Sequence, residues 1–157
     1  MDLKQAEDFY IRSLLNKVKL QEVMTKAVIT IDVNEPFSHV EEKFMRYHIR
    51  HLPVVENKIK LVGIVTQRDL YRIQSPRKLE EGDWYYDKEI LDSHILKSVM
   101  TPNPFTLGPE NTVADALLAM VDYKYGCIPI VGKDHALCGL ITQIDILRIG
   151  ARILREK

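Results

Sequence analysis

The sequence predicts a mixed α/β fold in which one structural unit occurs twice. The segments Gly63–Ile73 (GIVTQRDLYRI) and Gly139–Ile149 (GLITQIDILRI) are closely similar and lie 76 positions apart in a chain of 157 residues. Apolar runs rich in β-branched residues, which favour strands, alternate with segments whose apolar residues have helical spacing. Two copies are too few for a solenoid, so we expect a pseudo-twofold pair of units that bury one face against each other.

The duplication extends along most of the chain at the same offset. Val-Met-Thr at 23–25 recurs at 99–101, and the five residues from His51 (HLPVV) correspond to the five from Cys127 (CIPIV). The copies align without a gap, so each is expected to fold in the same way. We divide the chain into an N-terminal helix with the first repeat (1–73), a linker (74–92), and the second repeat with a C-terminal helix (93–157).

Within each copy the elements are expected in the order strand, helix, strand, strand, helix. The β-branched run Val28–Ile31 predicts the first strand. Leu52–Val55 and Leu61–Val65 predict the two strands of a hairpin, because the short segment between them suits a hairpin loop. A second helix is expected to begin near Thr66 or Gln67.

The first helix of each copy is predicted from its start and from its apolar face. Pro36 fits the first turn in one copy, and Thr112 with Asp115 indicates a capping box in the other. The apolar residues at helical spacing are Phe37, Val40 and Phe44 in the first copy, and Val113, Ala116 or Leu117, and Met120 in the second. These faces are expected in the core.

Helices are also expected at both ends of the chain. Met1–Lys17 predicts an amphipathic helix with one apolar stripe, formed by Leu3, Ala6, Tyr10 and Leu14. Ile144–Lys157 predicts another helix. Its basic residues near the C-terminus, where they interact favourably with the helix dipole, are Arg152, Arg155 and Lys157.

The linker is charged and holds the only tryptophan of the chain. Its aromatic residues Trp84, Tyr85 and Tyr86 either pack against a neighbouring part of the chain or form a patch that docks a partner. Cys127 and Cys138 lie among apolar residues, so we expect two buried, reduced thiols in strands. Neither has a second Cys or a His pair at metal-ligand spacing, and no metal site is expected.

The charge balance excludes some classes of function. Lys and Arg number 22, as do Asp and Glu, which argues against a general nucleic-acid-binding protein. The sequence has no apolar run long enough to span a membrane, and its N-terminal segment lacks the apolar core of a secretion signal. We therefore expect a cytoplasmic protein that binds neither nucleic acid nor a membrane.

The repeated Gly-x-x-Thr-x-x-Asp pattern places Thr66 and Asp69, and again Thr142 and Asp145, at a strand-to-helix turn. Free N–H groups and the helix dipole at such a turn suit a phosphate, and an acidic side chain suits a sugar diol. Together these groups favour a ribose-phosphate ligand. The same residues would also serve as a capping box of the following helix, and the spacing alone leaves both interpretations open.

These motifs, which recur in the same order in both copies, resemble those of the cystathionine-β-synthase (CBS) domain family. The matching features are Val-Met-Thr, the strand with Thr30 or Thr106, the Leu/Ile-Pro-Val/Ile-Val strand, and the Gly-x-x-Thr-x-x-Asp turn. The resemblance covers about Lys19–Ile73 and Ile95–Ile149. It implies two β-α-β-β-α repeats packed with pseudo-twofold symmetry as a Bateman module, two clefts between the repeats, and frequent homodimerisation.

The resemblance also implies two nucleotide sites, each with walls from both repeats. One combines Leu140, Thr142 and Asp145 with Ile29, Ile49 and Arg50. The other combines Ile64, Thr66 and Asp69 with Phe105, Tyr125 and Gly126. Asp is expected at the ribose hydroxyls, Thr at the phosphate and the apolar residues around the base. The implied ligand is AMP, ADP or ATP, with S-adenosylmethionine, NAD or cyclic di-AMP as alternatives and no metal.

The two implied sites are not equivalent. Arg50 corresponds to Gly126, and Arg68 precedes Asp69 where Ile144 precedes Asp145. Either arginine could bind a phosphate through its guanidinium fork, or remain a solvated surface charge. The aromatic residues Phe105 and Tyr125 could stack on a purine or pack in the core. We expect Phe105 in the core.

The expected function is that of a regulatory module that senses an adenosyl nucleotide. Nearly the whole chain is covered by the two repeats, so we expect it to signal to a protein partner in trans. A catalytic function is not expected, because the sequence has no convincing nucleophile–base pair, paired-carboxylate site or metal cluster. The alternative is a structural dimerisation or interaction module that holds no ligand.

Overall fold

The computed structural model describes residues 3–155 and divides the chain into two compact units. Unit 1 comprises Met1–Val28 and Phe105–Lys157, and unit 2 comprises Ile29–Pro104. The predicted terminal helices include Met1, Lys157 and the side chain of Leu3, which lie outside the described part. The domain division proposed above follows the sequence repeats, whereas the units follow the contacts of the folded chain.

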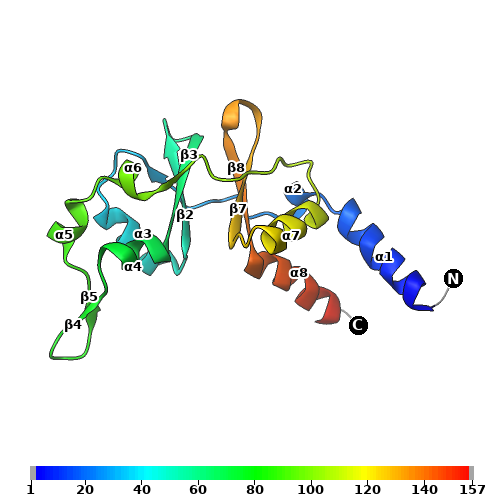
Figure 1. The fold of residues 1–157 in the computed structure, drawn as a ribbon, viewed down its shortest axis with the longest axis horizontal. Helices are drawn as coiled ribbons and strands as arrows, with labels where there is room; N and C mark the ends of the chain where they lie inside the picture. Colours follow the sequence, from blue (N-terminus) through cyan, green and yellow to red (C-terminus); the bar gives the residue numbers. More distant parts are fainter. Residues whose placement is uncertain (1–2, 156–157) are drawn as a thin grey trace. The chain divides into compact units, whose positions relative to one another are not determined.

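Unit 2 contains one mixed sheet with helices packed on it (Figure 1). The sheet order is β1-β2-β3-β6, with β1 parallel to β2 and the other neighbours antiparallel. The strands and helices are β1 (Ile31–Asp32), α3 (Ser38–Tyr47), β2 (His51–Glu56), β3 (Lys60–Thr66), α4 (Gln67–Ile73), β4 (Arg77–Lys78), β5 (Trp84–Tyr85), α5 (Lys88–Asp92), α6 (Leu96–Val99) and β6 (Thr101–Pro102).

Unit 1 repeats the helix and hairpin arrangement with an antiparallel β7–β8 pair. Leu107 forms an isolated parallel bridge with Ile130, at the place where unit 2 has the β1–β2 pair. The elements are α1 (Leu3–Lys17), α2 (Leu20–Val23), α7 (Val113–Asp122), β7 (Cys127–Val131), the 3-10 turn η1 (Lys133–His135), β8 (Leu137–Thr142) and α8 (Gln143–Arg155).

Each unit is completed by the Val-Met-Thr segment of the other sequence repeat. In unit 1, the Thr25 N–H donates to the Leu140 carbonyl at 2.9 Å, and the Leu140 N–H donates to the Thr25 carbonyl at 3.0 Å. In unit 2, β6 pairs with β3 in the register Gly63↔Pro102. The sequence repeats are therefore interleaved in the folded chain, which local patterns did not predict.

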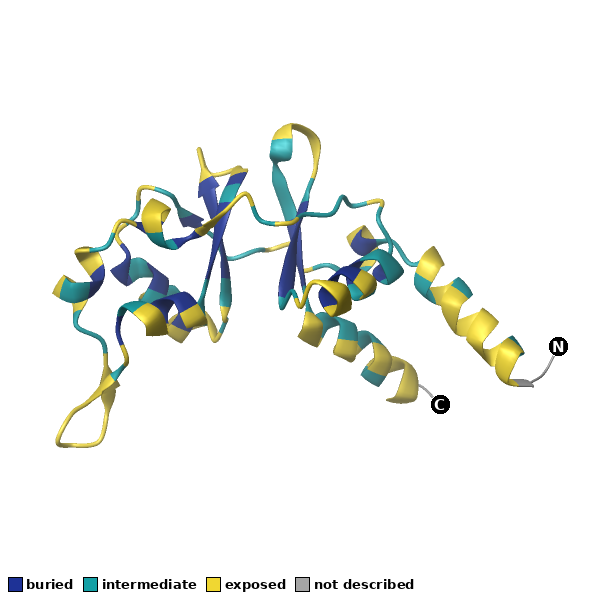
Figure 2. Cartoon of the chain, in the orientation of Figure 1, coloured by how far each residue is buried: buried dark blue, intermediate teal, exposed yellow. Residues whose placement is uncertain are grey.

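The predicted helix faces are buried, as Figure 2 shows for α3 and α7. Phe37 and Val40 are fully buried in the core of unit 2, and Val113 and Ala116 are buried in the core of unit 1. The predicted capping box is also confirmed. The Asp115 N–H donates to Thr112 Oγ1 at 3.2 Å, and the Thr112 N–H donates to Asp115 Oδ2 at 2.8 Å.

Two local predictions are wrong in detail. The strand expected at Val28–Ile31 is limited to β1, because only Ile31 and Asp32 pair with β2. On α1, Tyr10 and Leu14 are 72% and 48% exposed, so the predicted apolar stripe does not face the core. Leu15, one position further, packs against the core of unit 1 instead.

The linker folds in two parts that differ in burial. β4 and β5 form a small hairpin whose Trp84 is 64% exposed. After it, Tyr86 packs against the core of unit 2, and Leu91 on α5 is 1% exposed. The Ser38 N–H donates to Asp92 Oδ1 at 2.8 Å and thereby joins the start of α3 to the end of α5. The second half of the linker is thus part of unit 2.

Both cysteines are free and lie in strands, as expected. Cys127 is buried, but Cys138 is only partly buried, which corrects the prediction of two buried thiols. The Cys138 Sγ donates to the Ile130 carbonyl at 3.3 Å. Over residues 3–155, none of the helices combines the length and apolar character needed to cross a bilayer.

Candidate functional site

Thr142 and Asp145 form a compact hydrogen-bonded pair at the turn from β8 to α8 in unit 1. The Thr142 N–H and Oγ1–H both donate to Asp145 Oδ2 at 2.9 Å. The Asp145 N–H is 3.3 Å from Thr142 Oγ1, which accepts from it. The other carboxylate oxygen, Oδ1, lies 3.3 Å from Arg148 Nη1. The pair closes the first turn of α8 in the manner of a capping box.

Thr66 and Asp69 repeat this geometry at the turn from β3 to α4 in unit 2. The Thr66 N–H and Oγ1–H donate to Asp69 Oδ2, both at 2.8 Å. Asp69 Oδ1 lies 3.6 Å from Arg72 Nη1. In both units one carboxylate oxygen is used by the cap, and the other lies within ion-pair distance of an exposed arginine.

The segments before β2 and β7 lie beside these helix starts. The Gln67 N–H donates to the Arg50 carbonyl at 3.0 Å, and the Gln143 N–H donates to the Gly126 carbonyl at 3.1 Å. Ile49 and Ile29 pack against the core of unit 2. Ile64, in β3, is 9% exposed.

Each unit thus brings together one Thr–Asp pair and the segment that precedes the first strand of its own hairpin. The grouping across repeats joins residues of different units, so it stays a prediction. The residues in unit 1 are Leu140, Thr142, Asp145, Phe105, Tyr125 and Gly126, and those in unit 2 are Ile64, Thr66, Asp69, Ile29, Ile49 and Arg50.

Three aromatic rings stack on one another in unit 1. The ring centroids of Phe105 and Tyr125 are 5.2 Å apart, and those of Tyr123 and Tyr125 are 5.6 Å apart. Phe105 is 39% exposed, so the expectation that it lies in the core is wrong. Its position just before the Leu107 bridge leaves it on the surface of the unit, where it packs against two tyrosines.

The charged and titratable groups near the two turns differ between the units. Arg50 and Arg68 are both exposed in unit 2. Burial lowers the pKa of His51, and the positive charge of Arg50 lowers it further. At the corresponding place in unit 1, burial raises the pKa of the Cys127 thiol to about 12, with a further contribution from the Asp145 carboxylate.

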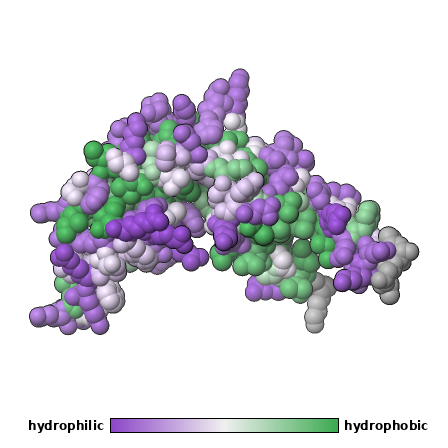
Figure 3. Space-filling view, viewed as in Figure 1, coloured by the Kyte–Doolittle hydropathy of each residue, from purple (hydrophilic) through white to green (hydrophobic). Residues whose placement is uncertain are grey.

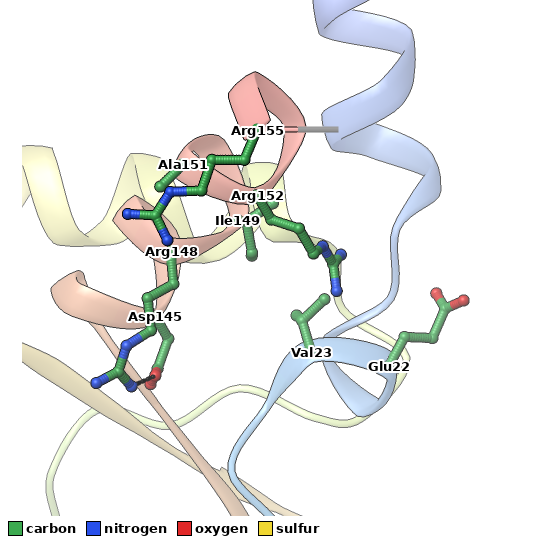
Figure 4. Close-up of a pocket in the computed structure, with 8 residues that line it drawn as sticks. All are labelled: Glu22, Val23, Asp145, Arg148, Ile149, Ala151, Arg152 and Arg155. Atoms are coloured by element: carbon green, nitrogen blue, oxygen red, sulfur yellow. Dashed lines mark hydrogen bonds and ion pairs between the residues drawn. The ribbon is translucent and has the colours of Figure 1, made fainter. Parts of the chain in front are cut away.

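A pocket of about 750 Å³ lies beside Asp145 in unit 1, between α2 and α8 (Figure 4). Its lining includes Arg148, Arg152 and Arg155 from α8, and Val23 from α2. Arg148 was not among the predicted site residues, and the other two arginines were predicted to interact with the helix dipole alone. Their spacing of four and three residues, which places them on one helical face, was a usable signal. Among residues 3–155, no group of three or more His, Cys, Asp or Glu side chains could hold a metal ion.

Comparison with other sequences identifies relatives of two kinds. A CBS domain-containing protein of Dictyostelium discoideum is 30% identical over 139 residues, covering 88% of this chain and 94% of the relative. The inosine-5'-monophosphate dehydrogenase of Korarchaeum cryptofilum is 35% identical over 147 residues, covering 92% of this chain. The chain spans only 24% of the dehydrogenase, so the similarity concerns one part of that enzyme.

Solved structures share the fold along most of the chain. The structure of CBSX2 in complex with AMP has a TM-score of 0.72 at 22% identity and covers 88% of this chain and 99% of that one. The CBS domain pair of protein MJ0100, with 5'-methylthioadenosine and S-adenosylmethionine, has a TM-score of 0.68 at 23% identity, and the match covers 85% and 99%. At these identities the likeness establishes the fold.

The family described as CBS domain matches this chain twice, at residues 20–75 and 96–152. These ranges contain both Thr–Asp turns, both hairpins and both Val-Met-Thr segments. Two matched repeats over most of the sequence, in a fold shared with solved CBS pairs, place this chain in the CBS domain family.

Proposed function

We propose that the protein is a regulatory module that binds an adenosyl nucleotide at its two Thr–Asp turns and signals to a protein partner in trans. The observation that carries the proposal is the same arrangement at Asp69 and Asp145. In each, one carboxylate oxygen is held by the cap and the other lies within ion-pair distance of an arginine. An oriented carboxylate oxygen is a suitable acceptor for a ribose hydroxyl.

The local chemistry supports a phosphate beside the ribose. Thr66 and Thr142 stand at helix starts, where the positive end of the helix dipole favours an anion. CBSX2 with AMP and the MJ0100 pair with S-adenosylmethionine and 5'-methylthioadenosine support an adenosyl ligand for this fold. AMP, ADP and ATP are therefore the first candidates, followed by S-adenosylmethionine, NAD and cyclic di-AMP.

In the proposed sites the remaining walls come from the opposite repeat. Ile29, Ile49 and Arg50 would complete the Asp145 site, together with Leu140. Phe105, Tyr125 and Gly126 would complete the Asp69 site, together with Ile64. The stacked rings of Phe105 and Tyr125 support a role beside a purine, because aromatic faces stack on bases.

The test is isothermal titration of the full chain with the six candidate ligands, using Asp69→Ala and Asp145→Ala. Asp115→Ala is a matched control, because Asp115 forms the same capping box on α7 but belongs to neither proposed site. Loss of a cap costs about 1 kcal/mol of stability in all three variants. Only the first two should lose a binding site.

The results separate nucleotide binding from a structural role. Saturable binding that disappears at one site with each Asp69 or Asp145 substitution, and persists in Asp115→Ala, supports the proposal. Equal weakening in all three variants would mean that the carboxylates act only through stability. Absence of binding to any of the six compounds would refute nucleotide sensing.

We propose that the protein is not itself an enzyme and acts in the cytoplasm. Its similarity to inosine-5'-monophosphate dehydrogenase covers 24% of that enzyme, so the activity of that enzyme is not carried over to this chain. Incubation with bound nucleotide followed by chromatography tests this, since any conversion of the ligand at a rate proportional to protein concentration would refute it. The partner is open to identification once the ligand is known.

A second candidate function is homodimerisation without a ligand. It is favoured by apolar side chains on the surface of unit 1, where Leu118, Val121 and Leu147 are 57%, 68% and 66% exposed. Figure 3 shows apolar residues gathered over the α7 and α8 part of this unit. Sedimentation of the wild-type chain and of Leu147→Glu tests it, since a dimer through this surface should become a monomer. Unchanged sedimentation would exclude Leu147 from the interface.

A further inference from the structure

The pocket between α2 and α8 is lined by more positive than negative side chains. Three arginines line it, whereas its acidic residues are Asp145 and Glu22. Figure 4 shows Arg148 lying against Asp145, while Arg152 extends toward Val23 and Glu22. The apolar part of the lining comes from Val23, Ile149 and Ala151. The pocket is therefore a partly apolar groove with basic groups along one side.

Both acidic groups accept hydrogen bonds from other parts of the unit, and Asp145 is also paired with Arg148. Glu22 Oε2 accepts from the Lys19 N–H at 2.6 Å, and Asp145 Oδ2 accepts from Thr142. Within residues 3–155, Arg152 and Arg155 have no Asp or Glu oxygen within ion-pair distance, unlike Arg148. Two guanidinium groups in this groove are thus unpaired with any carboxylate of the described residues.

The helix dipole does not explain the whole arrangement. Cations in the last turn of α8 would be favourable on any side of the helix. Arg148, Arg152 and Arg155 instead follow the i, i+4, i+7 spacing that keeps side chains on one face, and this face borders the groove. The first of them lies seven residues before the end of the helix, beyond the reach of a last-turn effect.

The groove and the proposed ribose site share one residue, Asp145. At 1.5 Å per residue, Arg152 lies about 10 Å along the helix axis from Asp145, and Arg148 about 5 Å. A single phosphate on a ribose at Asp145 can reach Arg148. Because Arg152 lies farther from Asp145, a chain of two or three phosphates would contact it more readily than a single phosphate, and its planar guanidinium pairs well with phosphate oxygens.

Unit 2 has no equivalent groove wall. Arg72 on α4 corresponds to Arg148, but Pro76 and Leu79 stand where α8 has Arg152 and Arg155. The helix α4 ends at Ile73, since Pro76 cannot continue it and also disfavours the helical conformation of the residue before it. The two Thr–Asp turns therefore offer the same carboxylate to a ribose, but they differ in the arginines farther along the helix.

We infer that the Asp145 site is selective for nucleoside di- and triphosphates, whose phosphate chain lies along α8 between Arg148 and Arg152 with Arg155 beside it. This inference rests on the proposed function, because Asp145 is taken to hold the ribose. It assigns the Asp69 site no such preference. The chain would then respond to the phosphorylation state of its ligand at one site only.

The test compares ATP, AMP and inorganic tripolyphosphate by isothermal titration in magnesium-free, low-salt buffer. The groove variant, its control and their parent all carry Asp69→Ala, so that binding is measured at the Asp145 site alone. The unmodified wild-type chain is measured in parallel. The groove variant is Arg152→Gln with Arg155→Gln. The charge-matched control is Arg12→Gln with Arg77→Gln, two exposed arginines outside the groove. Thermal unfolding checks that every variant is folded.

ATP is expected to bind about tenfold more tightly than AMP, as two additional charge-assisted contacts in an open groove would give. This preference should vanish in the groove variant and persist in the control. Equal affinities for ATP and AMP, or a preference that survives in the groove variant, would overturn the inference while leaving AMP sensing intact. Arginine-dependent binding of tripolyphosphate without any binding of AMP or ATP would instead refute the nucleotide function and make the groove a polyphosphate site.

Discussion

The side chain of Met24 lies directly over the backbone of Gly139, where a side chain would collide with it. A Cβ atom placed on Gly139 would come within 2.8 Å of Met24 Cγ. Met100 has the same relation to Gly63 in unit 2, where the added Cβ would lie 3.0 Å from Met100 Cγ. A side chain at the glycine of each Gly-x-x-Thr-x-x-Asp pattern would therefore force the methionine of a Val-Met-Thr segment to move.

Gly139→Ala should destabilise the protein by about 1–3 kcal/mol, because an added methyl group overpacks a buried contact. Gly150→Ala is the matched control, since a Cβ on Gly150 meets no atom within 4 Å and alanine favours the interior of α8. Urea unfolding measures both. The double variant Met24→Ala, Gly139→Ala should recover part of the loss. Equal effects of the two glycine substitutions would contradict this account.

The free energy of unfolding should decrease as the pH falls below 6.5 because of His51. Burial lowers its pKa below the ordinary value of 6.5, and Arg50 adds to the shift. The unfolded chain therefore binds the proton first as the pH falls, and stability present above pH 6.5 is lost below it. His51→Cys, which copies the residue at the equivalent position 127, should flatten this part of the pH profile. An unchanged slope in the variant would exclude His51.

The two thiols should differ in reactivity. Burial raises the pKa of Cys127 to about 12, so almost no thiolate is present at neutral pH. Burial also raises the pKa of Cys138, but this residue is only partly buried. We expect slow labelling of Cys138 and slower labelling of Cys127 by a thiol reagent, with rapid labelling of both in denaturant. Faster reaction of Cys127 than of Cys138 would argue against the described packing.

The two parts of the linker should respond differently to truncation. Leu91→Ala removes a side chain that is 1% exposed and should cost about 2–5 kcal/mol. Trp84→Ala removes a ring that is 64% exposed. Lys78 Nζ lies 6.0 Å from the centroid of this ring. The effect of Trp84→Ala should stay below about 0.5 kcal/mol. Comparable losses in the two variants would mean that the β4–β5 hairpin is packed.

Much of the fold could be predicted because its signals are local. Phe37, Val40 and Phe44 follow the helical period, and the hairpin strands are short apolar runs around a turn. The pairing of Thr25 with Leu140 could not be predicted in this way. It joins residues far apart in sequence, and nothing in the composition of either segment specifies which copy of the repeated strand will be its partner.

The candidate site was predicted in part for a similar reason. The Thr–Asp pairs were identified because their spacing is local, and it fits both a cap and a ligand site. The ring contacts of Phe105 are made with two tyrosines that follow a helix later in the chain. The groove at Arg152 depends on α2, which comes from the other end of the sequence. Such relations require the tertiary structure.

The exchange of the Val-Met-Thr segments has a consequence for inheritance. A gene fragment that encodes a single repeat would supply a hairpin and its helix but not the strand segment that covers its glycine. A product beginning after residue 75, for example, would keep Gly139 and Leu140 but lack Met24 and Thr25. The smallest portion of the gene that encodes a complete unit therefore extends across both copies, and duplication or loss is expected to involve them together.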